Sequence, residues 1–150
     1  MAKHPGSISP TFLVAAIVGL LPLAAPVQAQ SDPEAARFEN CSGSPRVTCV
    51  VDGDTIWYRG NKIRLADINA PEVSQPGCAQ EAALGARATR RLTELLNAGP
   101  FSLLRDGRDV DRYGRLLRVI TRRGTSLGSK LENEGLAEHW QGRRGSWCAG

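Results

Sequence analysis

The sequence predicts an α+β domain in which five short strands form a small closed barrel, with a helix after the third strand and one or two short helices near the C-terminus. Three observations lead to this prediction. Three runs rich in β-branched residues lie close together before residue 70, one long stretch has helical spacing, and two more strand-like runs follow it. Because the chain has 150 residues, we expect one such domain, over residues 45–150.

Residues 1–29 have the pattern of a secretory signal peptide. A basic start precedes an apolar run over 12–27, and Val-Gln-Ala at 27–29 is a small-residue cleavage pattern. The alternative is a transmembrane anchor, but the run is shorter than the ~20 residues of a spanning helix, and glycine and proline interrupt it. We therefore expect export to the periplasm or the cell exterior, with no membrane attachment after cleavage. Residues 30–44 are polar and are expected to form a leader to the domain.

The four cysteines, Cys41, Cys49, Cys78 and Cys148, all follow the predicted signal. An even number in a small exported domain predicts two disulfides, for which three connectivities are possible. Of these we favour a local Cys41–Cys49 bond and a Cys78–Cys148 bond that fixes the C-terminus to the body. Zinc binding is the alternative, but neither C-x-x-C nor H-x-x-x-H spacing occurs in the sequence.

The first three strands are expected at Arg46–Val51, Thr55–Arg59 and Lys62–Ile68. Asp52-Gly53-Asp54 and Gly60-Asn61 separate them as turns, so the three strands should form an antiparallel meander.

A helix is expected at Ala79–Leu96, and Asn97, Gly99 and Pro100 should end it. Its apolar residues recur at helical spacing: Leu84, Ala88, Leu92, Leu95 and Leu96.

Two strands follow at Phe101–Arg105 and Leu116–Thr121, then a short helix around Ser126–Glu134. Leu136–Trp140 is expected to add one more helical turn, with His139 and Trp140 as packing residues rather than catalytic ones. Five strands with a helix after the third is the order of the OB-fold, which commonly binds oligonucleotides.

Four groups suited to phosphodiester chemistry lie close together: Asp52, Asp54, Arg64 and Glu72. Carboxylates are hard oxygen ligands for a divalent cation, arginine is well matched to phosphate, and a glutamate can act as a general base. Each has a simpler interpretation, because Asp-Gly is a common turn pair and arginine and glutamate are usually solvated. Their combination within one meander favours the functional interpretation.

The positive charge of the chain is concentrated in Arg105–Arg123. This segment contains seven arginines and three aspartates, so its own net charge equals the formal net charge of +4 of the whole chain. These arginines could simply lie on a solvated loop and strand. Alternatively, they form a footprint for a phosphate backbone, with Tyr113 able to stack on a base. The sequence has no P-loop, dinucleotide-binding fingerprint or Ser-His-Asp arrangement that would favour other chemistry.

Between Arg46 and Ala137 the sequence resembles the thermonuclease (staphylococcal nuclease-like) family. The resemblance depends on an ordered set of motifs: VVDGDT, IRLADINAPE, EAALGARA, DRYGR and LENEGLA. It implies an OB-fold barrel with helices, and calcium-dependent cleavage of DNA and RNA that leaves a 3′-phosphate.

The resemblance also implies roles for individual residues. Arg64 and Arg115 match the two arginines that hold the scissile phosphate and stabilise its developing charge. Glu72 matches the glutamate that activates the attacking water. Arg112 and Tyr113 match a basic residue and a tyrosine that contact a neighbouring phosphate.

The implied Ca²⁺ site consists of Asp54, with Asp52 close beside it, then Asn69 and the main-chain carbonyl of Ala70. The family has an aspartate where this sequence has Asn69, so one negative charge is lost. Because calcium affinity depends on ligand charge, we expect weaker binding, which Asn69→Asp should strengthen.

The sequence therefore predicts an exported, monomeric, calcium-dependent nuclease acting on DNA or RNA. One alternative is an OB-fold module that binds nucleic acid without cleaving it, which Asn69 favours. Another is an exported scaffold domain that does not bind nucleic acid.

Overall fold

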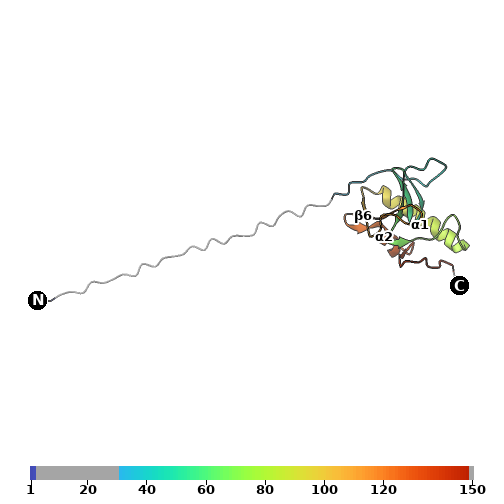
Figure 1. Ribbon diagram of the computed structural model, residues 1–150. Helices are drawn as coiled ribbons and strands as arrows, with labels where there is room; N and C mark the ends of the chain where they lie inside the picture. Colours follow the sequence, from blue (N-terminus) through green and yellow to red (C-terminus); the bar gives the residue numbers. More distant parts are fainter. Residues whose placement is uncertain (3–30, 149–150) are drawn as a thin grey trace.

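The computed structural model describes residues 1–2 and 31–148 of the chain (Figure 1). The expected signal peptide, residues 1–29, thus lies outside the described residues except for its first two. A sheet of short strands packs against the long helix α1 (Ala79–Asn97), and a short helix, α2 (Leu127–Asn133), contacts both α1 and the sheet. No helix in the described ranges is long and apolar enough to cross a membrane.

Five strands form one hydrogen-bonded path, in the order β1-β2-β3-β6-β5. Their bounds are Cys49–Asp52 for β1, Thr55–Tyr58 for β2, Asn61–Leu65 for β3, Leu116–Arg122 for β6 and Ser102–Leu104 for β5. The predicted antiparallel meander of β1, β2 and β3 is confirmed. β3 then pairs in parallel with β6, and β5 pairs antiparallel with β6, as does the two-residue strand β7 (Thr125–Ser126).

The predicted α+β class is confirmed, but the sheet is not closed into a barrel. The path ends at β1 and β5, which do not pair with each other in the described part of the chain. A segment from the expected leader lies against both ends instead. Glu34 exchanges two backbone hydrogen bonds of 2.9 Å with Phe101, just before β5, and Asn40 forms a bridge with Val50 in β1. These edge hydrogen bonds are therefore made to the leader segment rather than between β1 and β5.

The prediction of a helical turn at Leu136–Trp140 is wrong. The chain forms a strand there, β8 (Glu138–His139), which pairs antiparallel with β4 (Ile68–Asn69). The expected third strand is correspondingly shorter, because it bends at Ala66-Asp67 before β4 begins. The backbone of β4 needs a pairing partner, and β8 supplies it.

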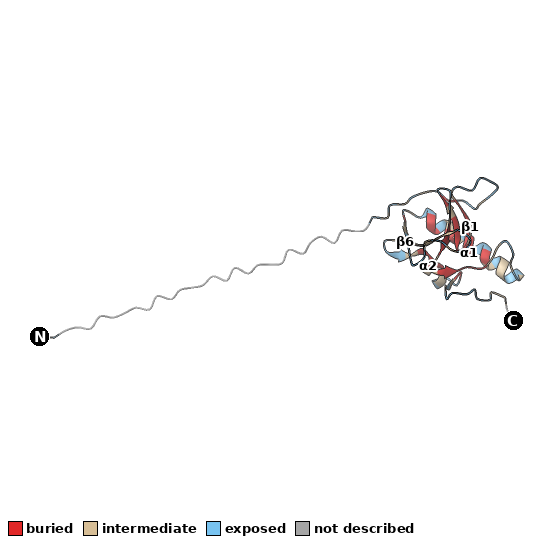
Figure 2. Ribbon diagram, viewed as in Figure 1, coloured by how far each residue is buried: buried red, intermediate tan, exposed pale blue. Residues whose placement is uncertain are grey.

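The core lies between the sheet and the buried side of α1, where Ala88, Leu92, Leu95 and Leu96 face inward as the helical spacing predicts (Figure 2). Phe38 from the expected leader is also part of it, with 1% of its surface exposed. The side chain of Asn97 bonds to both the N–H and the C=O of Phe38, at 2.8 and 2.9 Å. The leader is therefore packed into the domain rather than merely preceding it.

Arg122 of β6 caps the C-terminal end of α1. The last turn of this helix has no basic residue of its own, and its final carbonyls have no partner within the helix. The Arg122 guanidinium donates to the carbonyls of Leu95 at 2.7 Å and Pro100 at 2.8 Å, and to that of Gly99. This contact joins the helix to the strand that carries the second half of the site.

Both favoured disulfides are confirmed. Cys41–Cys49 closes a short loop, with a sequence separation of 8, at the start of β1. Cys78–Cys148 has a separation of 70 and joins the C-terminal segment to the N-cap residue of α1.

Candidate functional site

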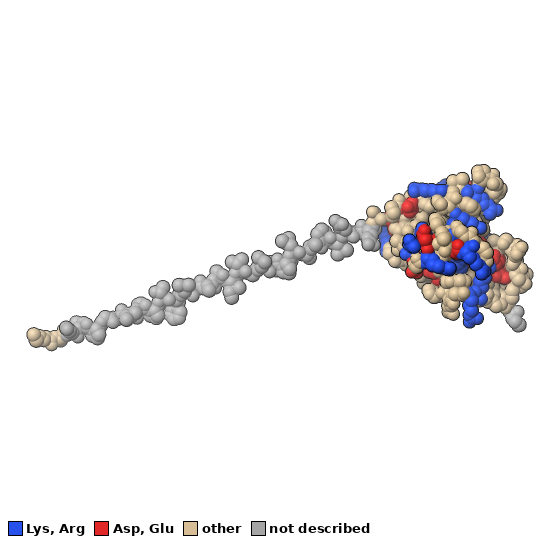
Figure 3. Space-filling view, in the orientation of Figure 1, with Lys and Arg blue, Asp and Glu red and all other residues tan. Residues whose placement is uncertain are grey.

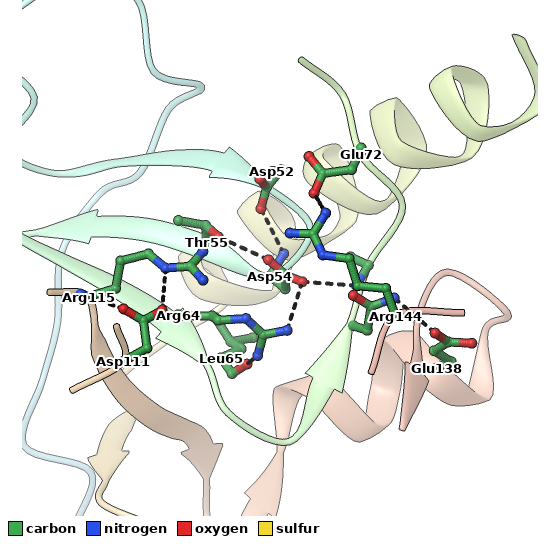
Figure 4. A network of polar contacts seen from close by, with 12 residues as sticks. Asp52, Asp54, Thr55, Arg64, Leu65, Glu72, Asp111, Arg115, Glu138 and Arg144 are labelled. Atoms are coloured by element: carbon green, nitrogen blue, oxygen red, sulfur yellow. Dashed lines mark hydrogen bonds and ion pairs between the residues drawn. The ribbon is translucent and has the colours of Figure 1, made fainter. Parts of the chain in front are cut away.

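The Asp52-Gly53-Asp54 segment forms the turn between β1 and β2, and the turn brings its two carboxylates together (Figure 4). The Asp54 N–H donates to Asp52 Oδ1 at 3.1 Å. A Cβ atom on Gly53 would lie 2.7 Å from the Cβ atoms of both Ala70 and Ala88. Only glycine allows this close approach, so the turn packs directly on Ala70, which follows β4, and on α1.

Asp54 is 7% exposed and connects three strands. Its Oδ1 accepts a hydrogen bond from Thr55 Oγ1 at 2.9 Å, and its Oδ2 accepts one from the Ala70 N–H at 3.0 Å. Arg64 Nη2 lies 3.6 Å from the same Oδ2. The position of this carboxylate is therefore fixed before any ligand binds.

Asp52 lies in an unfavourable electrostatic environment for an anion. Its pKa is raised to about 7, first by burial, then by the charge of Asp54 and to a smaller extent by that of Glu72. The hydrogen bond from the Asp54 N–H lowers the pKa, but by less. Within the described residues no arginine or lysine forms an ion pair with Asp52. Arg64 pairs with Asp54 alone, so the unpaired Asp52 carboxylate beside it favours binding of a positive ion.

Asn69 follows in β4 and is 2% exposed. Its Nδ2 donates to Glu138 Oε1 at 2.9 Å, and the two residues are register partners in the β4–β8 pair. Glu138 was not predicted as a site residue, because the pairing that brings it here joins two segments far apart in the sequence.

The donors expected for calcium fit that ion in chemical type. Two carboxylates, the Asn69 amide oxygen and the Ala70 carbonyl are all hard oxygen donors, which Ca²⁺ prefers. The described residues contain no group of three or more His, Cys, Asp or Glu side chains that could hold a metal. A cation here would depend on the amide and main-chain oxygens as well as on the two aspartates.

Arg64 is a buried residue, 6% exposed, so its interpretation as a solvated arginine is wrong. Its Nη1 donates to the Leu65 carbonyl at 2.7 Å, and its guanidinium carbon lies 4.5 Å from the centre of the Trp140 ring. Trp140 was expected only to pack on the domain from a helical turn. It follows β8 instead, and its ring faces the Arg64 guanidinium.

Arg115 is held by Asp111 in the loop before β6. Its Nε donates to Asp111 Oδ2 at 2.7 Å, and the backbone N–H groups of Tyr113 and Arg115 donate to Oδ1 at 2.9 and 3.0 Å. Burial raises the pKa of Asp111, but these hydrogen bonds outweigh burial and the pKa is lowered. Asp111 was not predicted as a site residue, although it is the first residue of the DRYGR motif.

Tyr113 is 69% exposed, and the guanidinium carbons of Arg112 and Arg115 lie 4.8 and 5.5 Å from its ring centre. The exposed ring and Arg112 therefore lie beside the half-buried Arg115, an arrangement suited to contacts with a phosphate backbone.

A cleft of about 800 Å³ brings the predicted phosphate-binding residues together from distant parts of the chain, whereas Asp52, Asp54, Asn69 and Glu72 are not among its lining residues. β3 and β6 are paired, with Arg64 opposite Leu117, and this pairing places Arg64 and Arg115 along the same cleft. The charged and aromatic lining residues are Arg64, Asp106, Arg108, Asp111, Arg112, Tyr113, Arg115, Trp140 and Arg144. Basic side chains spread over the visible face of the domain, with carboxylates between them (Figure 3).

Glu72 lies beside the acidic turn but is bound to Arg144 from the C-terminal segment (Figure 4). A Cβ atom on Gly85 of α1 would lie 2.8 Å from the Pro71 carbonyl and 2.9 Å from that of Glu72, so this segment packs closely on the helix. The Glu72 side chain remains 27% exposed. Arg144 was not predicted, because only the tertiary fold brings the C-terminal segment across the site.

Comparison with known proteins matches residues 62–146 to the family described as "Staphylococcal nuclease homologue". The chain is 42% identical over 93 residues to the "SPbeta prophage-derived endonuclease YokF" of Bacillus subtilis, covering 58% of this chain and 31% of that protein. It is 40% identical over 93 residues to "Endonuclease YncB" of the same organism, covering 58% and 43%. A "Micrococcal nuclease" of Shigella flexneri is 40% identical over 78 residues, covering 49% and 40%. The chain thus matches less than half of the length of each of these relatives.

Proposed function

This chain belongs to the staphylococcal nuclease homologue family, and on that premise we propose that its cleft hydrolyses phosphodiester bonds of DNA or RNA. The observation that carries the proposal is the convergence of Arg64 and Arg115 on one cleft, with Asp54 of the acidic turn paired to Arg64. Glu72 lies on the other side of this turn, beside Asp52. Phosphodiester hydrolysis builds negative charge on a five-coordinate phosphate, and two fixed guanidinium groups would stabilise it.

In the proposed reaction, Arg64 and Arg115 bind the scissile phosphate. Glu72 takes a proton from the attacking water, whose oxygen forms a bond to phosphorus. The bond from phosphorus to the 5′ oxygen breaks and leaves a 3′-phosphate, and the 5′ oxygen takes a proton from solvent water to become a 5′-hydroxyl. Arg144 has to leave the Glu72 carboxylate before Glu72 can accept the proton.

The donor set of Asp52, Asp54, Asn69 and Ala70 would hold the calcium ion, which would supply further positive charge beside the reacting phosphate. Arg112 and Tyr113 would contact the neighbouring phosphate and fix the register of the strand.

We further propose that the chain is exported through its N-terminal signal and acts as a monomer in the periplasm or outside the cell. The two disulfides support an oxidising compartment. The strand order β1-β2-β3-β6-β5 supports assigning the sheet to the OB-fold of the family, although β1 and β5 do not pair to close a barrel in the described residues.

The competing proposal is a module that binds nucleic acid without cleaving it. Two observations favour it. Asn69 is neutral where the metal-binding pattern has an aspartate, and Arg144 forms an ion pair with Glu72, the proposed base.

The deciding experiment compares hydrolysis of single-stranded DNA by the mature, oxidised protein with calcium and with a chelator. We expect turnover only with calcium, and a loss of about 10²–10⁴-fold in Glu72→Gln with DNA binding retained. Glu94→Gln, on the exposed face of α1, is the matched control and should leave turnover unchanged. Negligible turnover under both conditions, together with tight and salt-sensitive binding, would support the binding module instead.

A further inference from the structure

Glu138 lies directly beside the position where the metal-binding pattern of this chain lacks a charge. Asn69 is neutral, so Asp52 and Asp54 are the remaining carboxylates among the expected ligands. The affinity of a site for calcium depends on how many negative charges surround the ion. The neighbours of Asn69 therefore decide how much the missing charge matters.

The Asn69 amide is oriented by Glu138. Its Nδ2 donates to Glu138 Oε1 at 2.9 Å, across the β4–β8 pair, and Asn69 is almost fully buried. Because the nitrogen and oxygen lie at opposite corners of the amide, this bond directs Oδ1 away from Glu138. Oδ1 is the atom able to ligate a cation, so Glu138 selects which end of the side chain is available for that purpose.

The Glu138 carboxylate is itself fixed from the C-terminal segment. The Gly145 N–H donates to the same Oε1 at 2.7 Å. A Cβ atom on Gly145 would overlap this carboxylate, so a larger residue there would displace the Glu138 side chain. Within the described residues no lysine, arginine or histidine nitrogen lies within 4 Å of the Glu138 carboxylate oxygens. Its charge is therefore held in place but not neutralised by an ion pair.

We propose that Glu138 is a positioning residue for the calcium site and restores the charge missing at Asn69. This inference rests on the proposed function. A carboxylate that accepts a hydrogen bond from a ligating side chain fixes its orientation and increases its basicity. Asn69 and Glu138 together carry the single negative charge that an aspartate at position 69 would carry alone, but the charge lies on the neighbouring strand.

The test is calcium binding measured by titration calorimetry on the oxidised protein, in four forms: unsubstituted, Glu138→Gln, Asn69→Asp and the double variant. Glu138→Gln should weaken calcium binding about 10–100-fold when residue 69 is asparagine. It should weaken binding less than about threefold when residue 69 is aspartate, because that residue carries its own charge and no amide has to be oriented. Glu132→Gln, in α2 and bonded to His139, removes one nearby charge and should leave affinity unchanged.

The four-way comparison separates positioning from a general structural role. If Glu138 only supported the fold, its loss would weaken binding equally in both backgrounds, and that result would overturn the proposal. Unchanged affinity in Glu138→Gln would overturn it too, while leaving the proposed nuclease function intact. Absence of calcium binding by the unsubstituted protein would overturn both this inference and the calcium dependence of the proposed function. Thermal unfolding in chelator should show all four forms folded.

Discussion

Arg64 and Arg115 line the same cleft but are held there in different ways. Arg64 is buried between Asp54 and the Trp140 ring and donates to a main-chain carbonyl. Arg115 lies just before β6, and its position depends on the single carboxylate of Asp111. One guanidinium is thus positioned by packing of the domain and the other by a local hydrogen-bonded turn. Removing the packing around Arg64 should therefore lower the stability of the domain, whereas removing the turn that holds Arg115 should change the position of its guanidinium.

The largest expected effect comes from removing each arginine in turn. Arg64→Ala leaves Asp54 buried without its partner, so the free energy of unfolding should fall by about 3–5 kcal/mol. Arg115→Ala should cost only about 1.5–3 kcal/mol, from lost charged hydrogen bonds. Turnover should fall by about 10²–10³-fold in both. Urea unfolding and DNA hydrolysis measure the two effects, with Arg87→Ala on the exposed face of α1 as control. A greater loss of stability in Arg115→Ala would contradict the comparison.

Asp111→Asn tests the contribution of the turn without removing the arginine that the turn holds. Arg115 remains but is no longer fixed by a carboxylate, so turnover should fall by about 10–100-fold. The pKa of Asp111 is lowered in the folded protein, so its stabilising contribution is present above its ordinary pKa of 3.8 and is lost as pH falls through the folded value. The stability difference between the two proteins should therefore be constant near neutral pH and narrow in acid.

Urea midpoints between pH 7 and pH 3 test this dependence on pH. Asp106→Asn in the same exposed loop is the control. A difference that stays constant into acid would show that Asp111 does not stabilise the fold as an anion.

Asp52 should show the opposite dependence on pH. Because burial and the Asp54 charge raise its pKa to about 7, the folded state binds a proton that the unfolded state releases above an ordinary pKa of 3.8. Its favourable contribution is therefore complete below 3.8 and is lost as pH rises through about 7. Asp52→Asn should gain stability relative to the unsubstituted protein between pH 4 and pH 8, as measured by urea unfolding in chelator. Parallel stability curves over this range would contradict the raised pKa.

The smallest effect is expected at the aromatic side of Arg64. Trp140→Leu removes the ring that faces its guanidinium, a contact of about 0.5–2 kcal/mol, so turnover should fall only a few-fold. Trp140→Phe keeps a ring and should recover most of the loss. Equal turnover in the leucine and phenylalanine variants, measured on single-stranded DNA, would assign Trp140 a packing role alone.

Local patterns predicted much of the fold. The meander β1–β3, the extent of α1 and the position of α2 follow from turn residues and helical spacing, which act over a few residues. The favoured disulfide pairs were also confirmed.

The features missed by the sequence depend on contacts between distant segments. β8 has two residues, too few to show strand periodicity, and forms only because β4 needs a partner. The prediction of a closed barrel was wrong because the segment that contains Glu34 and Asn40 pairs at or next to both edge strands. Arg122, which caps α1 from β6, gives no signal in a helix pattern.

The same distinction applies to the candidate site. Asp52, Asp54, Arg64 and Glu72 were predicted as a group. The structure brings the first three together around one turn and its neighbouring strand, with Glu72 beside Asp52. Glu138 and Arg144 were not predicted, although they contact Asn69 and Glu72 directly. Both come from the last thirteen residues of the chain, whose place in the site is determined by β4–β8 pairing and by the Cys78–Cys148 bond.

The Cys78–Cys148 bond also has a consequence for a chain cut by a protease. The arginine-rich loop before β6 is exposed, and cleavage after Arg108 would separate the part that carries Arg64 from the part that carries Arg115. Because Cys78 and Cys148 lie on opposite sides of that position, the two fragments would remain covalently joined. The nicked protein should therefore migrate as one species without reductant and as two with it, and the β3–β6 pair can stay assembled after the loop is cut.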